Sequence, residues 1–229
     1  MPIILSIETS TGLASAALLQ DNAVLAREAT GVNTHSQTIL PLVQSLLAQA
    51  GIPLSRCDAI AFGSGPGSFT GVRTACGIAQ GLAFGADLPL VPIVTLEAMA
   101  HACRAKTGAA EVLAVLDARM GEVYWAQYRH DGEFWQVVSA PALSAPAMVR
   151  PDGPVIACGN GLAAYASAFD PVILQDMQPD VMPHAACIAQ LATIAFARGG
   201  AVAARDAQPL YLRNKVALTT QERAAKVSV

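Results

Sequence analysis

The hydrophobic and polar positions of the first thirty residues are typical of short strands. Apolar residues dominate 3–8, 13–19 and 23–30, whereas 9–12 and 20–22 carry the threonine, serine, glycine, aspartate and asparagine residues that favour tight turns. Consecutive strands joined by such short turns pair in antiparallel fashion. The pattern therefore predicts an antiparallel meander of three strands at the start of the chain.

A helical period of apolar residues comes next and predicts one long helix over 35–50. Thr34 and Gln37 have the spacing of an N-terminal capping box, and Gly51 followed by Pro53 is a stop signal. The apolar side chains share one helical stripe, formed by Ile39, Leu42, Val43, Leu46, Leu47 and Ala50. This arc is wider than one sheet face needs, so it indicates a second surface that faces a partner.

The most distinctive segment is the glycine-rich run 63–73. It lies between a short apolar strand at 59–62 and a second predicted helix at 70–84. A glycine turn before a helix N-terminus presents free backbone N–H groups and is able to bind phosphate, but the run lacks the Gly-Lys-Ser/Thr ending of a P-loop. Gly77 and Gly81 each cost a helix about 1 kcal/mol relative to alanine. Their presence implies that something must approach the backbone of this helix closely.

The rest of the chain repeats the beginning in a shorter form. A strand is predicted at 90–94 and a helix at 96–106, which close the first half. Strands at 112–117, 122–129 and 134–138 then form a second three-strand meander.

Two similar halves with mixed sheets are the pattern of the actin-like and sugar-kinase-like duplicated α/β fold. The expected division is a first subdomain, 1–106, with the helices that are expected to face a partner, and a reduced second subdomain, 107–229, with a basic C-terminal tail. Within the second subdomain, the proline-rich segment 139–154 is expected to be irregular and 184–198 to be helical.

Composition narrows the class of protein. Of 229 residues, 53% are hydrophobic and 14% charged, as in a compact protein whose surface is partly covered by a partner. The net charge of −3 argues against a chain that binds nucleic acid by itself. We expect a cytoplasmic location, because no apolar run has the length of a membrane span and the N-terminus predicts a strand rather than a signal peptide. The scattered five cysteines and four histidines predict reduced thiols and no metal site.

Four motifs make the chain similar to a known family. They are Gly-Pro-Gly-Ser-Phe-Thr-Gly-Val-Arg at 65–73, Ala-Gln-Gly-Leu-Ala at 79–83, Asp-Ala-Arg-Met-Gly-Glu-Val-Tyr-Trp at 117–125 and Pro-Leu-Tyr-Leu-Arg-Asn at 209–214. With them the chain resembles, over nearly its whole length, the bacterial TsaB family, also called YeaZ. The resemblance implies an actin-like ATPase fold and a non-catalytic subunit that activates TsaD. Together with TsaE, these proteins install the threonylcarbamoyl group on N6 of the adenosine next to the anticodon of certain tRNAs.

The resemblance also implies partners and an interface. The partners are a TsaD-like catalytic subunit, a TsaE-like ATPase, a second copy of this chain when TsaD is absent, and tRNA through the complex, with no membrane. The interface is expected on the helices 35–50 and 70–84, at His35, Ile39, Leu42, Val43, Leu46, Arg73, Thr74, Gly77 and Gly81. We expect Val43→Glu or Leu46→Glu to disrupt association and leave the fold intact. Arg73 is expected to meet the partner or a nucleotide at the junction.

Both nucleotide loops of an actin-like ATPase are altered here. The first keeps the hydroxyls of Thr9 and Ser10 but follows a glutamate instead of an aspartate. The second has Asp117 and Arg119 where phosphate binding needs bare backbone N–H groups. For either loop, turn formation and nucleotide binding both stay open. The glycines of the run 63–73 are interpreted as structural residues that seat the helix 70–84 near the helix 35–50; they are Gly63, Gly65, Gly67 and Gly71.

No catalytic or metal-binding residue is predicted. By the resemblance, the metal-ligand positions of TsaD proteins fall on Leu96 and Ala100, which do not bind metals. No cofactor is expected, except ATP or ADP at the partner junction. Asp117, Arg119 and Glu122 are expected to form a local ion-paired turn.

Two alternative functions stay open. One is an ATPase or small-molecule kinase that is active alone. The other, more weakly supported, is a peptidase, although no serine has a histidine at a recognisable triad spacing.

Overall fold

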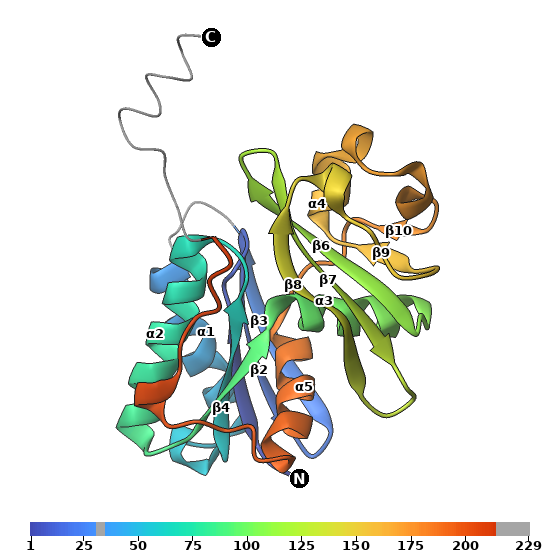
Figure 1. The fold of residues 1–229 in the computed structure, drawn as a ribbon. Coiled ribbons are helices and arrows are strands. Elements are labelled where there is room, and N and C mark those ends of the chain that lie inside the picture. Colours follow the sequence, from blue (N-terminus) through green and yellow to red (C-terminus); the bar gives the residue numbers. More distant parts are fainter. Residues whose placement is uncertain (31–34, 214–229) are drawn as a thin grey trace, which may run out of the picture.

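The first lobe is a five-stranded mixed sheet with helices on both faces (Figure 1). The computed structural model describes residues 1–30 and 35–213. The sheet order is β3-β2-β1-β4-β5, formed by β1 (Ile4–Glu8), β2 (Leu13–Gln20), β3 (Ala23–Thr30), β4 (Ala59–Gly65) and β5 (Leu90–Val94). The first three strands pair in antiparallel fashion, which confirms the predicted meander. β4 and β5 run parallel to β1, because helical crossovers connect them.

Four helices cover this sheet. α1 (His35–Ala50) and α2 (Phe69–Ala86) share one buried cluster with residues from one face of the sheet, among them Leu18 and Phe62. α5 (Ala185–Ala197) shares another cluster with the opposite face, to which α3 (Thr95–Thr107) contributes Ala98. Alternate residues of β1 therefore point into different halves of the core, as the two-residue period of a strand requires.

The second lobe is another five-stranded mixed sheet, in the order β10-β9-β6-β7-β8. Its strands are β6 (Glu111–Arg119), β7 (Glu122–His130), β8 (Trp135–Ser144), β9 (Ile156–Cys158) and β10 (Met177–Gln178). α3 covers one face through Leu96 and Met99, and α4 (Asn160–Ala164) contributes Leu162 to the core on the other face. Because α3 belongs to the cores of both lobes, it connects them mechanically as well as covalently.

The structure differs from the sequence predictions in two places. Residues 139–144 belong to β8, although the prolines around them predict irregular chain. β8 is an edge strand, where a proline without an N–H donor is tolerated. In addition, α5 packs on the first sheet, so the C-terminal part of the predicted subdomain 107–229 lies with the first lobe. Thr34, and with it the predicted capping box, lies outside the described residues.

After α5 the chain runs back along α2 toward the cleft between the lobes (Figure 1). Leu90 and Val202 exchange two backbone hydrogen bonds, of 2.9 and 2.8 Å. The side-chain amide of Gln80 donates to the carbonyls of Ala204 and Ala207, at 2.9 and 3.1 Å. These contacts hold the returning segment on α2 and deliver its last described residues, 209–213, to the cleft. We call residues 209–213 the C-terminal strap.

Candidate functional site

A cavity of about 570 Å³ lies between the two lobes. Its walls come from the β1–β2 turn, the loop before α2, the β6–β7 hairpin, the start of α4 and the C-terminal strap. The polar groups that line it include Ser10, His35, Asp117, Asn160 and Arg213. Segments from the whole length of the chain meet here, and they include both loops that the sequence singled out as altered nucleotide loops.

The glycine loop packs directly on the β1–β2 turn. A Cβ atom added at Gly63 would overlap the Glu8 carboxylate, and one added at Gly71 would overlap the Thr9 carbonyl. The backbone N–H of Ser68 donates to the carbonyl of Ser10 at 2.7 Å, and the Thr9 hydroxyl donates to the carbonyl of Gly71 at 2.7 Å. The glycines therefore have a structural role, as predicted. Gly63, Gly67 and Gly71 accommodate residues 8–10, at the end of β1 and in the turn after it, whereas Gly65 accommodates Leu210. The helix α2 that follows the loop packs against α1.

The Glu8 side chain is fully buried beneath the glycine loop. Its Oε1 accepts a hydrogen bond from the backbone N–H of Ser10, whereas its Oε2 has no hydrogen-bond partner among the described residues. Burial raises the pKa of Glu8 above its ordinary value of 4.5, because the charged form loses its hydration; the hydrogen bonds from Ser10 and Thr9 oppose this only in part. The neutral acid is therefore favoured by the fold.

Glu8→Gln is expected to raise the melting temperature by a few degrees at pH 8 and to have little effect near pH 4. The folded pKa is raised, so the stabilisation that comes from the protonated side chain is complete below about 4.5 and is lost as the pH rises toward the folded value. A neutral amide of the same shape avoids that loss. Thermal unfolding between pH 4 and 8 measures the effect, with the exposed Glu133→Gln as control. An equal pH dependence in Glu8→Gln and the parent chain would contradict this explanation.

The β6–β7 hairpin forms the opposite wall of the cavity and is held by its own side chains. Asp117 pairs with Arg119 at 3.1 Å and also accepts the backbone N–H of Arg119 at 2.7 Å and the hydroxyl of Tyr165 at 2.9 Å. The backbone N–H of Asp117 donates to Asn160 Oδ1 at 3.0 Å. The predicted ion-paired turn is confirmed for Asp117 and Arg119. Glu122 pairs with Arg213 instead, at 2.7 Å.

The structure corrects the assignment of three predicted interface residues. Ile39, Val43 and Leu46 are at most 2% exposed and belong to the core beneath α1, so they cannot supply apolar area to a partner of the folded chain. These three residues share one side of α1, as their spacing predicts, but the sheet of the first lobe covers that side. Leu42 is half-buried and packs against the same core, and His35 lines the cavity at the start of α1.

The exposed side of α2 carries the rest of the predicted interface. Gly77 and Gly81 are exposed, and a Cβ added at either one would meet no atom within 4 Å. Nothing within the described chain therefore requires glycine at these two positions. Phe84, which sequence reasoning missed, is 86% exposed beside them, and Leu40 of α1 is 42% exposed. Both residues are apolar but lie outside the apolar stripe of their helix. This feature of the sequence could have indicated that they are exposed.

Arg73 and Thr74 lie at the cleft end of α2 and already have partners within the chain. The Arg73 guanidinium donates from Nε to the hydroxyl of Tyr211 at 2.7 Å and stacks on the ring of Phe69, with 3.5 Å between its central carbon and the ring centre. The hydroxyl of Thr74 donates to the carbonyl of Thr70 at 2.9 Å. The contact of Arg73 with Tyr211 joins residues far apart in the sequence and was not predicted.

His101 and four of the cysteines have structural surroundings. His101 contacts Gln190 Oε1 through Nε2 at 3.1 Å and accepts the indole N–H of Trp135 on Nδ1 at 3.4 Å, which confirms its interpretation as a satisfied histidine. Burial lowers the pKa of His101. Four of the five cysteines are buried. Within residues 1–30 and 35–213, no group of three or more histidine, cysteine, aspartate or glutamate residues is arranged to hold a metal ion.

None of the helices in the described part of the chain has both the length and the apolar character needed to cross a lipid bilayer.

The fold and the cleft define a two-lobed actin-like α/β protein. The family model described as "TsaD: tRNA N6-adenosine threonylcarbamoyltransferase" matches residues 22–227. A relative from Escherichia coli (strain K12), described as "tRNA threonylcarbamoyladenosine biosynthesis protein TsaB", is 42% identical over 222 residues, which cover 93% of this chain and 96% of the relative. A Haemophilus influenzae relative with the same description is 39% identical over 225 residues, which cover 93% of this chain and 94% of the relative.

Solved structures agree with these relatives. YeaZ from Pseudomonas aeruginosa matches with a TM-score of 0.85 at 37% identity, covering 93% of this chain and all of that one. The chain belongs to the TsaB family, also called YeaZ. This confirms the resemblance carried by the four sequence motifs and the actin-like fold that it implied.

A second solved structure bears on the peptidase alternative. It has a TM-score of 0.86 at 36% identity and is described as a Pseudomonas aeruginosa protein similar to peptidase YeaZ. In this chain the Ser10 hydroxyl has no hydrogen-bond partner among the described residues, and the Ser68 hydroxyl accepts the backbone N–H of Gly71. Neither hydroxyl is held by a histidine in the way an activated nucleophile requires.

Proposed function

We propose that the chain takes part in forming N6-threonylcarbamoyladenosine in tRNA, as a non-catalytic scaffold subunit. The observation that carries this proposal is the similarity, over nearly the full length of both chains, to proteins described as TsaB of tRNA threonylcarbamoyladenosine biosynthesis. In this role the chain works in the cytoplasm beside a TsaD-like catalytic subunit and a TsaE-like ATPase. It reaches tRNA through that complex, and a second copy of the chain takes the place of TsaD when TsaD is absent.

The geometry of the two altered loops supports a non-catalytic role. In the first loop, the Thr9 hydroxyl donates to the carbonyl of Gly71 and the backbone N–H of Ser10 donates to Glu8, so neither of these donors is free to bind a phosphate. In the second loop, the backbone N–H groups of Asp117 and Arg119 donate to side chains of the protein itself. Phosphate binding in such loops depends on free backbone donors. We place ATP or ADP, if the complex holds one, at the junction with the partner.

The exposed side of α2 is the docking surface that we propose for the TsaD-like subunit. Gly77 and Gly81 leave room for another helix to approach the backbone, and Phe84 offers an aromatic anchor beside them. Leu40 extends the surface onto α1. A stable complex needs about 800 Å² from each partner, so we expect the contact to extend along the outer sides of both helices, which have 16 and 18 residues.

Gly81→Arg is expected to weaken binding of the TsaD-like subunit at least about tenfold without unfolding the chain. The new side chain enters open space in the free chain but occupies the room that an approaching helix would use. Co-elution and titration calorimetry measure binding, and circular dichroism checks the fold. Met148→Arg is the matched control, because Met148 is 67% exposed on the second lobe. Equal affinity of Gly81→Arg and Met148→Arg would contradict the placement of this surface.

Reconstitution tests the function itself. We expect threonylcarbamoyl transfer to tRNA from TsaD, TsaE, threonine, bicarbonate and ATP to depend on addition of this chain, which by itself modifies no tRNA. Modification by the isolated chain would overturn the scaffold proposal. Titration of the isolated chain with Mg-ATP separates this proposal from the ATPase or kinase alternative, since only an enzyme active alone would bind the nucleotide tightly and turn it over.

A further inference from the structure

The C-terminal strap is fitted to the glycine loop of the first lobe by its backbone. The N–H of Leu210 donates to the carbonyl of Ser64 at 2.7 Å. The carbonyl of Leu210 lies so close to Gly65 that an added Cβ would be 3.0 Å from it. Gly65 also has a φ of +106°, which residues with a side chain rarely adopt. Glycine at position 65 therefore permits this approach of the strap.

The next residue of the strap is attached to the start of α2. Tyr211 accepts a hydrogen bond from Arg73 Nε at 2.7 Å, and the Arg73 guanidinium stacks on the ring of Phe69 while it approaches the ring of Tyr211. Its central carbon is 3.5 Å from the ring centre of Phe69 and 5.4 Å from that of Tyr211. Stacking of this kind stabilises a contact beyond the hydrogen bond alone.

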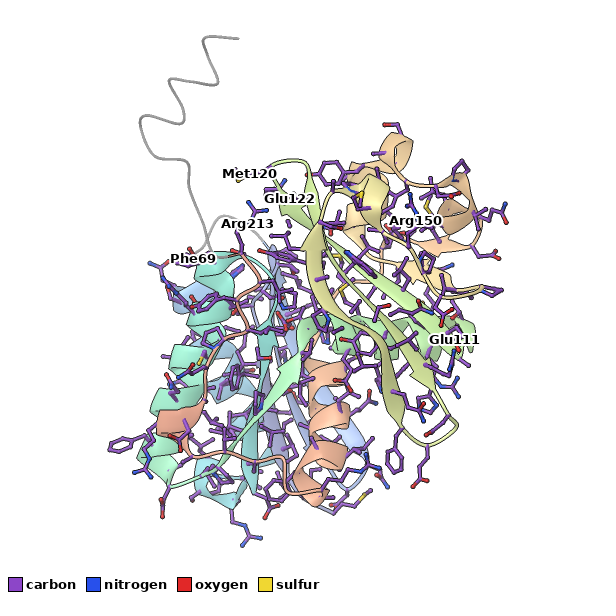
Figure 2. All side chains as sticks on the ribbon, viewed as in Figure 1. Phe69, Glu111, Met120, Glu122, Arg150 and Arg213 are labelled. Carbon is purple, nitrogen blue, oxygen red and sulfur yellow. The ribbon has the colours of Figure 1, made fainter. Side chains whose placement is uncertain are left out.

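Two residues further on, the strap is attached to the second lobe. Arg213 Nη2 donates to Glu122 Oε2 at 2.7 Å and to the carbonyls of Ala118 and Arg119 at 3.1 and 3.4 Å, while Nη1 lies 2.8 Å from Met120 Sδ. The Arg213 side chain is only 14% exposed. Figure 2 shows Arg213 beside Glu122 and Met120 of the hairpin, on the side of the cleft that faces Phe69. Charge-assisted bonds from a planar guanidinium to several acceptors are strong and directional.

The attachments at Tyr211 and Arg213 lie close together in the sequence and restrict how far the two lobes can separate. Tyr211 and Arg213 are separated by one residue, and two residues of extended chain span at most about 7 Å. The short backbone between them limits how far the lobes can move apart at the cavity unless one attachment breaks. α3 packs in the cores of both lobes and connects them independently of the strap. The strap therefore adds a second connection, at the cavity itself.

We propose that residues 210–213 form an intramolecular clamp that sets the width of the cavity between the lobes. The clamp holds the β6–β7 hairpin against the loop before α2, and the cavity widens only when Arg213 leaves the hairpin. All of these contacts lie within this chain, so the clamp does not depend on the function proposed for the complex.

Hydrogen exchange on the full chain tests the clamp from the strap side. In Arg213→Ala we expect the backbone amides of residues 118–122 to exchange at least about tenfold faster than in the parent chain, because the hairpin loses its attachment to the first lobe. Arg205→Ala is the matched control: Arg205 lies in the same returning segment, but its ion pair with Asp206, at 3.7 Å, is exposed. The control is expected to exchange like the parent chain.

A second variant and a distance measurement test the clamp from the hairpin side. Glu122→Gln removes the charge that Arg213 contacts, and the Glu122 side chain is 38% exposed, so this change leaves the core untouched. Spin labels at Asp87→Cys and Met148→Cys, in a Cys187→Ala background, report the separation of the lobes. We expect a broader distance distribution in both Arg213→Ala and Glu122→Gln. Parent-like exchange rates at residues 118–122 together with a parent-like distance between the spin labels would overturn the clamp. If Arg213→Ala does not fold, the same two measurements on Glu122→Gln provide the test.

Discussion

Val43→Glu is expected to unfold the chain or leave it insoluble, and not to release a partner from an intact subunit. Val43 is 2% exposed and lies in the core beneath α1, in the same buried cluster as Leu46 and Phe62. An unpaired charge in such a place costs about 3–5 kcal/mol, a large part of the roughly 5–15 kcal/mol that stabilises a typical domain. Soluble yield and thermal unfolding followed by circular dichroism measure the effect.

Gln44→Glu is the control for that experiment. Gln44 is the next residue of α1 and is exposed, so the same new charge meets water instead of the core. We expect Gln44→Glu to melt close to the parent temperature. If Val43→Glu melted at that temperature as well, the side chain would have to reach solvent, and the earlier expectation that position 43 faces a partner would regain support.

Gly71→Ala is expected to destabilise the chain by about 3 kcal/mol or more, a loss of the size caused by severe backbone conflicts. The added methyl group would overlap the backbone carbonyl of Thr9, and that carbonyl belongs to the buried turn between β1 and β2. The atoms nearest to the added methyl group belong to the backbone of Thr9 and Ser10, so no flexible side chain can move away to make room. The glycine loop and the first turn must therefore separate, which also breaks the hydrogen bond from the Thr9 hydroxyl to the carbonyl of Gly71.

Gly77→Ala is the matched control in the same helix. Its added Cβ would meet no atom within 4 Å, so only the gain in helix propensity remains, about 0.5–1 kcal/mol of stabilisation. Chemical denaturation of both variants measures the difference. Opposite signs for the two substitutions would confirm that one glycine serves packing within the chain and the other does not. A loss of stability in Gly77→Ala similar to that in Gly71→Ala would contradict this distinction.

Much of the first lobe was predictable because its signals are local. The turn residues at 9–12 and 20–22 and the apolar runs between them specify a meander, since strand pairing across short turns needs no distant partner. The helix predicted over 35–50 begins and ends where the structure places it, and the helix predicted over 70–84 is extended by one residue at its start and two at its end. The family resemblance was equally accessible, because it rests on contiguous motifs.

The candidate site was less predictable, because it depends on contacts between distant segments. Arg73 and Tyr211 are 138 residues apart, and Arg213 is 91 residues from Glu122. Neither hydrophobic periodicity nor motif spacing indicates that residues so far apart in the sequence are in contact. The glycine loop illustrates the same limit: its composition predicts a structural turn, but only the fold shows that Glu8, Thr9 and Ser10 pack against its glycines.

The sequence by itself determined which residues form the helices and strands of the first lobe up to β5, which side of α1 is apolar, and the family to which the chain belongs. Hydrophobic periodicity and turn-forming residues act within a few positions of the sequence, so they can be recognised without knowledge of the tertiary structure. The tertiary structure decided what covers each apolar side. It places the sheet against Ile39, Val43 and Leu46, leaves the glycines of α2 exposed, and brings the C-terminal strap across the cavity, because burial and long-range contacts are properties of the packed chain and not of any single segment.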